Sequence, residues 1–392
     1  MIWLKRGLIA ILALAAIGLA LFLALGPAIA DDRFNPVTPH DPYPVSDAAQ
    51  ALHDTLTIGD LHSDSLLWNR DLLARNDRGH MDLPRLIEGN VAVQVFTAVT
   101  KSPRGMNYER NATDAADNIT LLAMGQLWPV RTWNSLFQRA LYQAEKLHDF
   151  EAASGGGLRI VREADDLDAV LAARAQGDDV VGAILGIEGA HPLEGDLANL
   201  DRLEDAGYRV IGLQHFFDNA LGGSLHGVGD AGLTEFGRAV VGQVAARGLI
   251  LDVAHSSPQV VRDVLDMTDM PFILSHGGIA GQCESRRNLS DDLMARIADA
   301  GGVLGVGYWA DVTCDDSPAG VATAIVAATE VMGVDRVALG SDYDGTVRVG
   351  FDASELAALT QALMDAGLSD DDMAAVMGGN MLRVIRDRLA AR

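Results

Sequence analysis

Four short stretches of this sequence each place a candidate metal-binding side chain directly after a run of apolar residues. They are Asp60-Leu61-His62-Ser63-Asp64, Gly186-Ile187-Glu188-Gly189, Asp252-Val253-Ala254-His255 and Leu274-Ser275-His276-Gly277. An apolar run of four to eight residues is typical of a buried strand, and a side chain at a strand end is held by a rigid element. If the four ends converge, their imidazole and carboxylate groups would bind transition metals such as zinc.

The first stretch contains a pair of candidate ligands. His62 and Asp64 are separated by one residue, so on an extended strand end their side chains point the same way and can hold one cation together. His80 and Asp82 have the same spacing, but Asp82 followed by Pro84 is typical of a helix start. Only the first pair follows a strand-like run, and only it is a candidate metal site.

The other three stretches carry Glu188, His255 and His276. Glu188 ends the most apolar segment, and a carboxylate buried there must be paired, protonated or metal-bound. A bridging position between two metals would satisfy it; a salt bridge to an arginine is the alternative. A single histidine after a strand is usually a hydrogen-bonded structural residue, whereas two after neighbouring strands, each flanked by small residues, favour metal binding.

Further strand ends also carry polar residues. His215 follows the fourth predicted strand, the pair Arg286-Arg287 comes after the sixth, and Asp342 follows the eighth. Enzymes built on (β/α)8 barrels place their catalytic groups at the carboxyl ends of the strands. Asp344 could replace Asp342 in role, but Asp342 lies nearer the strand end, and an aspartate before glycine is typical of a turn.

The chain pattern predicts the barrel that would position these residues. Strands are predicted at 57–61, 91–96, 180–187, 210–213, 249–253, 272–275, 303–306 and 337–339, and helices at 200–206, 235–247, 258–267, 291–300 and 321–332. Alternating strands and helices favour a parallel sheet, and eight units favour a closed (β/α)8 barrel of the TIM type. A content of 49% hydrophobic but 5% aromatic residues fits an aliphatic α/β core.

One connection is longer than a crossover between parallel strands requires. Residues 97–179 follow the second strand and contain helical patterns at 112–127, 132–150 and 164–175. We therefore predict a helical insertion on the catalytic side of the barrel.

The N-terminus has the pattern of a leader. Lys5 and Arg6 precede the uncharged apolar run 7–25, and a small-residue segment ends before Asp31. The run is close to the roughly 20 residues that span a bilayer, so a cleaved signal peptide and a retained membrane anchor both fit. In both cases the chain after Asp31 lies outside the cytoplasm, either periplasmic or anchored. We divide the chain into a leader at 1–30, a linker and barrel lead-in at 31–56, and the barrel at 57–392.

Composition excludes some partners. The formal net charge is −24, and no basic run occurs after the N-terminus, which excludes nucleic acid. The membrane would be contacted only through the leader, and a homodimer is left open. Cys283 and Cys314 are either one disulfide of an exported protein or two free thiols, and two cysteines are too few for a metal-thiolate framework.

Taken together, these motifs resemble the renal or membrane dipeptidases, peptidase family M19. The resemblance extends from about residue 57 to 380 and rests on Asp60-x-His62-x-Asp64, Gly186-Ile187-Glu188-Gly189, His255-Ser256-Ser257, Ser275-His276, Ser285-Arg286-Arg287-Asn288 and Gly340-Ser341-Asp342-Tyr343-Asp344-Gly345. It implies hydrolysis of dipeptides by a water that two zinc ions share. By this resemblance His62 and Asp64 hold one zinc, His255 and His276 hold the second, and Glu188 bridges the two.

The resemblance also implies roles for the remaining residues. His215, Arg287 and Asp342 match positions at which the family contacts substrate and handles protons. His215 would stabilise the oxyanion, Asp342 would carry the proton to the leaving amine, and Arg287 would bind the C-terminal carboxylate of the dipeptide. The segment around His215 and residues 97–179 depart from the family pattern, so the preferred dipeptide is not predicted.

Two other functions are compatible with a barrel of this kind. Related metal-dependent barrels hydrolyse lactones, cyclic amides or phosphotriesters, but many of these bridge their metals with a carboxylated lysine and begin with His-x-His. Here no lysine follows Lys146, and the first pair is His62-x-Asp64. A non-catalytic exported binding barrel would be marked by the loss of metal ligands, and this chain has lost none of them.

Overall fold

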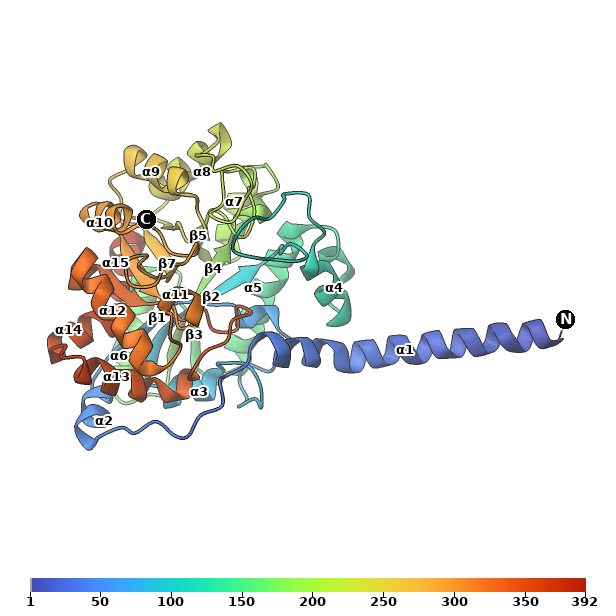
Figure 1. Cartoon of the computed structure of the whole chain (residues 1–392), viewed down its shortest axis with the longest axis horizontal. Helices are drawn as coiled ribbons and strands as arrows, with labels where there is room; N and C mark the ends of the chain where they lie inside the picture. Colours follow the sequence, from blue (N-terminus) through green and yellow to red (C-terminus); the bar gives the residue numbers. More distant parts are fainter. Residues whose placement is uncertain (1) are drawn as a thin grey trace.

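Eight parallel strands close into a barrel in the computed structural model, which describes residues 2–392 (Figure 1). They are β1 (Ile58–Ser63), β2 (Val91–Val99), β4 (Val181–Glu188), β5 (Tyr208–Gly212), β6 (Ile250–Asp252), β7 (Ile273–Gly277), β8 (Val303–Val306) and β9 (Val337–Leu339). Their order is β2-β1-β9-β8-β7-β6-β5-β4, and β4 pairs back to β2 from Val93↔Gly182 to Val99↔Glu188. All eight predicted strands are present, and the predicted (β/α)8 class is confirmed.

Helices surround the barrel. In the order of the chain they are α2 (Asp47–His53), α3 (Leu83–Glu88), α6 (Ala164–Ala175), α7 (Ala198–Asp205), α8 (Glu235–Ala246), α9 (Pro258–Met267), α10 (Asp291–Asp299), α11 (Ala310–Thr313), α12 (Pro318–Met332), α13 (Leu356–Asp365), α14 (Asp370–Ala374) and α15 (Asn380–Leu389). The five helices predicted between residues 200 and 332 are present to within a few residues.

One end of the barrel is filled by side chains. Helix α15 contacts β1, β6, β8 and β9. Its Met381 packs with Ile250 and Val303, the first residues of β6 and β8. The fit around Gly59 is tight, because a Cβ there would lie 2.7 Å from the sulfur of Met381. Since the amino ends of the strands are closed in this way, a ligand can approach only at their carboxyl ends.

The predicted insertion lies between β2 and β4. It contains α4 (Asn118–Gly125), the 3-10 turn η2 (Val130–Thr132), α5 (Leu136–Ala153), the short strand β3 (Leu158–Ile160) and α6. The sequence did not predict β3, which pairs with β4 outside the closed barrel. The predicted helix at 112–127 began too early. Asp117 caps α4 by accepting hydrogen bonds from the backbone amides of Ile119 and Thr120, and the preceding residues form a loop.

Helix α1 (Ile2–Phe34) projects from the barrel (Figure 1). It is long and apolar enough to cross a membrane, with a mean hydropathy of 3.0 over its most apolar window, which is not buried against the barrel. The helix continues past residue 30, where we placed the end of the leader. Its last turns pack on the barrel, where the Asp31 carboxylate lies 3.1 Å from Nε of Arg70 and accepts a hydrogen bond from Asn35.

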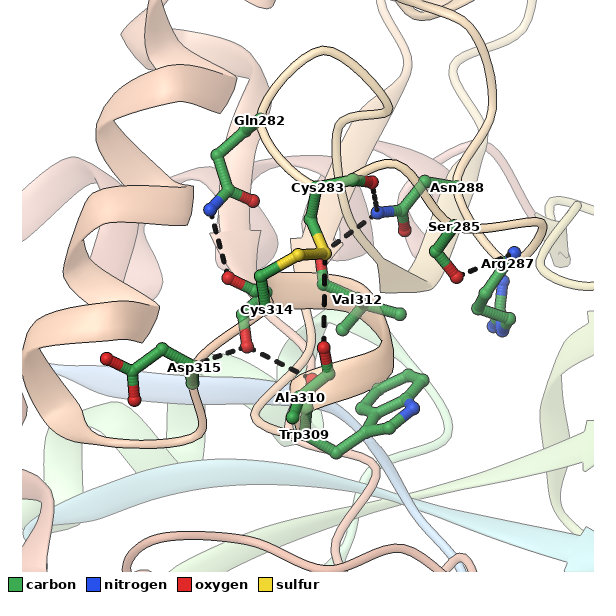
Figure 2. Close-up of a disulfide and its surroundings, with 11 residues drawn as sticks. Gln282, Cys283, Ser285, Arg287, Asn288, Trp309, Ala310, Val312, Cys314 and Asp315 are labelled. Atoms are coloured by element: carbon green, nitrogen blue, oxygen red, sulfur yellow. Dashed lines mark hydrogen bonds between the residues drawn. A yellow bond between two sulfur atoms is a disulfide. The ribbon is translucent and has the colours of Figure 1, made fainter.

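A disulfide joins Cys283, in the loop after β7, to Cys314, which follows α11 (Figure 2). The sequence left open whether these cysteines are bonded or free, and in the structure they form a disulfide. Nδ2 of Asn288 bridges the same two segments, because it lies 3.0 Å from both the Cys283 and the Val312 carbonyl oxygens. Both links hold the loop that carries Arg287 against the segment after β8.

Candidate metal centre and active site

The predicted ligands meet at the carboxyl ends of the strands. His62 lies in β1 and His276 in β7, Glu188 is the last residue of β4, and Asp64 and His255 follow β1 and β6 by one and three residues. All five side chains are buried. The cluster thus lies at the carboxyl ends of the strands, where enzymes with this fold have their active sites.

The carboxylate of Glu188 is the centre of this cluster. Its Oε1 lies 3.0 Å from Nε2 of His255, 3.3 Å from that of His276 and 3.5 Å from that of His62. Its Oε2 lies 3.2 Å from Nε2 of His215. Burial, followed by the nearby charges of Asp64 and Asp342, raises the pKa of Glu188 well above its usual range. Four imidazoles therefore point their Nε2 atoms at one buried carboxylate.

Hydrogen bonds behind the rings decide which nitrogens carry protons. The Ser275 hydroxyl donates to Asp252 at 2.6 Å, so its oxygen is left to accept from Nδ1 of His276, 2.9 Å away, and of His62, 3.2 Å away. The Nε2 atom of His276 is then a bare acceptor, whereas the Asp64 carboxylate outweighs burial and raises the pKa of His62. This arrangement of a serine and a carboxylate behind the ring is what orients histidine metal ligands.

Two ring nitrogens that face one another must share a proton or a metal cation. Nε2 of His276 lies only 2.9 Å from Nε2 of His255, and burial lowers the pKa of both rings well below the usual range. Neutral imidazoles are the form that binds metal. Three sets of side chains have ligand atoms within 4.8 Å of one another: His62 with Asp64 and Glu188, Glu188 with His215 and His255, and His62 with His276 and Asp342. The donor set fits a divalent metal that accepts nitrogen and oxygen ligands.

The pair His62 and Asp64 has the geometry that its spacing predicted. Oδ1 of Asp64 lies 3.5 Å from Nε2 of His62. The Thr97 hydroxyl, from β2, lies 2.6 Å from the same carboxylate oxygen. The two side chains therefore lie side by side, and a neighbouring strand fixes the carboxylate.

Asp342 and His255 occupy strained backbone positions. Their φ angles are +59° and +60°, in the left-handed region that residues other than glycine rarely adopt. Such strain, costing about 1–3 kcal/mol each, concentrates at active sites. Oδ1 of Asp342 lies 3.8 Å from Nε2 of His62, and burial raises the pKa of Asp342 above its usual range. Just before Asp342, the backbone of Gly340 packs closely against β7, since a Cβ at Gly340 would lie 1.9 Å from the Ser275 carbonyl oxygen.

His215 is held from the other side. Its Nδ1 lies 3.2 Å from the carbonyl oxygen of Lys101, which can only accept, so Nδ1 carries the proton and Nε2 faces Glu188. Burial lowers the pKa of His215 to about 4. In its neutral form this ring can accept a proton or a metal at Nε2, but cannot donate there.

Arg287, rather than Arg286, reaches the site. Arg287 is buried, donates from Nη2 to the His276 carbonyl oxygen at 2.8 Å and leaves its Nε without a hydrogen-bond partner. Burial lowers its pKa, which makes an anionic ligand favourable there. The Arg286 side chain is 43% exposed and lies 3.9 Å from Glu109, at the surface.

Aromatic residues narrow the cleft above the cluster. The residues that line it are Met106, Tyr108, Glu188, His215, Phe216, His255, Arg287, Trp309, Asp342, Gly345, Thr346 and Val347. Met106 and Tyr108 come from the insertion, and the Tyr108 hydroxyl accepts a hydrogen bond from Nε1 of Trp309 at 3.0 Å. The segment that departs from the family pattern therefore forms part of the cleft wall.

Sequence reasoning missed the residues that support the cluster. Asp252 was quoted in its motif but given no role, although a carboxylate that ends a buried strand was the signal used for Glu188. Ser275 and Thr97 gave no signal, because hydroxyl groups are common on buried strands. Asp344 is structural, as suspected from its turn, and binds Arg70 at 2.5 Å.

His80 and Asp82, the second pair with this spacing, have structural roles. Asp82 caps α3 by accepting from the backbone amide of Arg85. Nδ1 of His80 accepts from the backbone amide of Asp344 at 2.9 Å. Neither side chain belongs to the metal-ligand groups found among the described residues.

Comparison with known proteins shows the family of this chain. The family model for membrane dipeptidases, peptidase family M19, matches residues 46–392. Dipeptidase aclJ of Aspergillus oryzae is 33% identical over 221 residues, which are 53% of this chain and only 51% of that protein's length. An uncharacterized dipeptidase of Schizosaccharomyces pombe, C965.12, is 28% identical over 78% of this chain and 71% of its own length.

A solved structure has the same fold. It is a metallopeptidase from Rhodobacter sphaeroides, crystallised with a phosphinate mimic of the dipeptide L-Ala-D-Ala, with a TM-score of 0.68 and 24% identity over 84% of this chain and 99% of its own. The family match covers the barrel from before β1 to the last residue. This chain belongs to the membrane dipeptidase family, peptidase family M19.

Proposed function

We propose that this protein is a dipeptidase that uses two zinc ions. His62 and Asp64 would hold one ion and His255 and His276 the other, with Glu188 shared between them. The observation that carries the proposal is the convergence of four histidine Nε2 atoms on the Glu188 carboxylate, within 3.5 Å. When bound, the two ions would supply a water of lowered pKa and polarise the peptide carbonyl.

Arg287 would select short peptides by their C-terminal end. Its guanidinium is buried in the cleft wall, and its Nε has no partner within the protein. A planar guanidinium pairs with a carboxylate through two parallel hydrogen bonds. The phosphinate dipeptide mimic bound by the Rhodobacter relative supports a dipeptide as the substrate class.

His215 and Asp342 would handle charge and protons. Because Nδ1 of His215 already donates to Lys101, His215 can stabilise an oxyanion from Nε2 only as the imidazolium. Burial lowers the pKa of this ring to about 4, so the imidazolium would form only as negative charge develops during the reaction, with the Asp64 carboxylate favouring it. The buried carboxyl of Asp342 has a raised pKa, which suits a group that takes a proton and passes it to the departing amine.

We propose that the reaction takes place outside the cytoplasm. The apolar helix α1 and the disulfide between Cys283 and Cys314 both support export, because disulfides persist in oxidising compartments.

Metal analysis combined with a panel of L,L and L,D dipeptides tests the function. We expect two zinc ions per chain and hydrolysis of dipeptides, both lost together in the variant His276→Ala. The control is His40→Ala, at an exposed histidine that lies beside Glu355 and outside the cluster. A folded His276→Ala variant that keeps both zinc and activity would disprove the assignment, and cleavage of lactones or phosphotriesters but no dipeptide would point to the other hydrolase class.

A further inference from the structure

We propose that α1 is retained as an anchor and that the catalytic domain rests on the outer leaflet of the membrane through exposed apolar side chains of α4 and η2. The occupant of this surface is the apolar part of a lipid bilayer. The proposal does not depend on which reaction the barrel catalyses.

The length of α1 fixes the depth at which α4 would lie. The uncharged run at residues 7–25 is about 28 Å long at 1.5 Å per residue, close to the roughly 30 Å of a bilayer core. Phe22 and Gly26, at the end of this run, line a groove together with α4, and a Cβ on Gly125 of α4 would lie 3.2 Å from the Phe22 ring. Helix α4 is therefore held where the span ends, at the boundary between lipid and water.

Exposed apolar residues gather at the same place. In the part of the chain that the structure describes, the large apolar side chains most exposed outside α1 are Leu121 at 51%, Leu127 at 68% and Val130 at 69%. All three belong to α4, η2 or the turn between them. Figure 1 shows α4 on the side of the barrel from which α1 leaves. Clustered exposed apolar residues mark interaction sites, whereas scattered ones do not.

Leu127 is also strained. Its φ angle is +58°, in the left-handed region where a leucine costs about 1–2 kcal/mol more than a glycine. The residue follows the end of α4, a position at which glycine is common. Since the side chain is mostly exposed, packing within the protein does not offset this strain. Insertion into lipid would offset it.

The groove between α1 and α4 argues that the leader stays attached. It has a volume of about 600 Å³, and α1 forms one wall through Phe22, Pro27 and Ala30, opposite Ile119 and Leu122. Cleavage after Ala30 would remove that wall and expose the apolar residues behind it. It would also place a new ammonium group on Asp31, whose buried carboxylate is paired with Arg70.

The contact with lipid would be apolar rather than electrostatic. The chain carries a formal charge of −24, which repels anionic headgroups. Zwitterionic phosphatidylcholine vesicles are therefore the appropriate probe. The groove shares Met106 and Thr346 with the catalytic cleft, so the cleft would open close to the membrane surface.

Fluorescent labels on the full-length protein in phosphatidylcholine vesicles test the surface. A polarity-sensitive dye is attached to Leu121→Cys or Leu127→Cys, with Met267→Cys as the control, because Met267 is an exposed apolar residue on α9. The native cysteines are paired and do not react. We expect blue-shifted emission, and quenching by lipids that carry a shallow spin label, at the two leucine positions only.

Two results would overturn the proposal. One is emission at Leu121→Cys and Leu127→Cys that equals that of Met267→Cys and is not quenched, in variants whose thermal unfolding matches the parent. The other is a mature protein from its own cells whose mass shows an N-terminus at Asp31. Retention of the whole leader, together with quenching, supports it.

Discussion

Arg287 donates a hydrogen bond from Nη2 to the backbone carbonyl oxygen of His276, 2.8 Å away. The guanidinium proposed to bind the substrate carboxylate is thus tied to the strand that carries a proposed zinc ligand. The C-terminal carboxylate and the peptide carbonyl of a bound dipeptide would then be held by one rigid unit, and fixed geometry of this kind lowers the barrier to reaction.

Replacing this arginine with lysine should weaken binding more than chemistry. Arg287→Lys keeps a positive charge but loses the planar pair of donors, so we expect KM for dipeptides to rise at least about tenfold with a smaller change in kcat. Steady-state kinetics measure both. Arg286→Lys, at the surface beside Glu109, is the matched control and should change neither. A tenfold fall in kcat with KM unchanged would contradict the role of Arg287 in substrate binding.

The hydroxyl of Ser275 should control metal affinity without contacting metal. Ser275→Ala removes the acceptor behind His62 and His276, and the loss of such a partner usually weakens metal binding about 10–100-fold. Competition with a chelator measures the affinity for zinc. Ser256→Ala is the control, because this buried hydroxyl next to His255 binds Gln214 instead of a ring nitrogen. Equal zinc affinity in the two variants would show that the bond to Ser275 has no such effect.

Substitutions at Asp342 and Asp344 should have different effects, because we expect Asp342 to act in catalysis and Asp344 to stabilise the fold. Asp342→Asn cannot carry a proton, so we expect kcat to fall about 10²–10⁴-fold while zinc content is kept. Asp344→Asn should instead lower Tm, because it breaks a buried ion pair with Arg70. Elemental analysis and calorimetry distinguish the two. Loss of zinc in Asp342→Asn would mean that this carboxylate is a ligand.

Removal of the disulfide should cost stability and loosen the substrate site. The bond closes a loop with a sequence separation of 31, for which chain entropy predicts a loss of about 3–4 kcal/mol in the free energy of unfolding. We expect this in the double variant Cys283→Ser and Cys314→Ser, together with a raised KM, because the loop carries Arg287 (Figure 2). Denaturant titration and kinetics give the two values. A stability equal to the parent would contradict the first expectation.

Lys146 should make the free energy of unfolding rise with pH. Burial lowers its pKa from 10.5 to about 7, while its ammonium group donates to the Leu66 and Trp68 carbonyl oxygens at 2.7 Å. Between pH 7 and 10 the unfolded chain binds this proton and the folded chain does not, so stability rises by up to about 1.4 kcal/mol per pH unit. Denaturant titrations of metal-free protein at several pH values measure the slope. Lys146→Met should lack this contribution, and an identical slope in both proteins would refute it.

The barrel and the ligand cluster could be predicted because both depend on local pattern. Strands buried on both faces are continuous apolar runs, and the carboxyl ends of parallel strands meet, so His62, Glu188 and His276 could be brought together without coordinates. The (β/α)8 class and the family were confirmed in this way.

Other features depend on contacts that are distant in sequence. Strand β3 has three residues, too few for a pattern, and exists because β4 offers it a free edge. The hydrogen bonds of Ser275 with Asp252 and two rings need three strands in place. Tyr108 reaches the cleft only because its loop folds back over the barrel, where it meets Trp309. No spacing rule connects such residues before the chain is folded.

The pairing of β2 with β4 has a consequence for how this enzyme family can diversify. Seven residue pairs, from Val93↔Gly182 to Val99↔Glu188, close the barrel without any help from the chain between them. That chain, with α4, α5 and the loop that bears Tyr108, could therefore differ between relatives while the hydrogen-bond ladder and the proposed metal ligands stay in place. New substrate preferences can then arise by replacement of one segment, provided that a carbonyl oxygen at position 101 still accepts from His215.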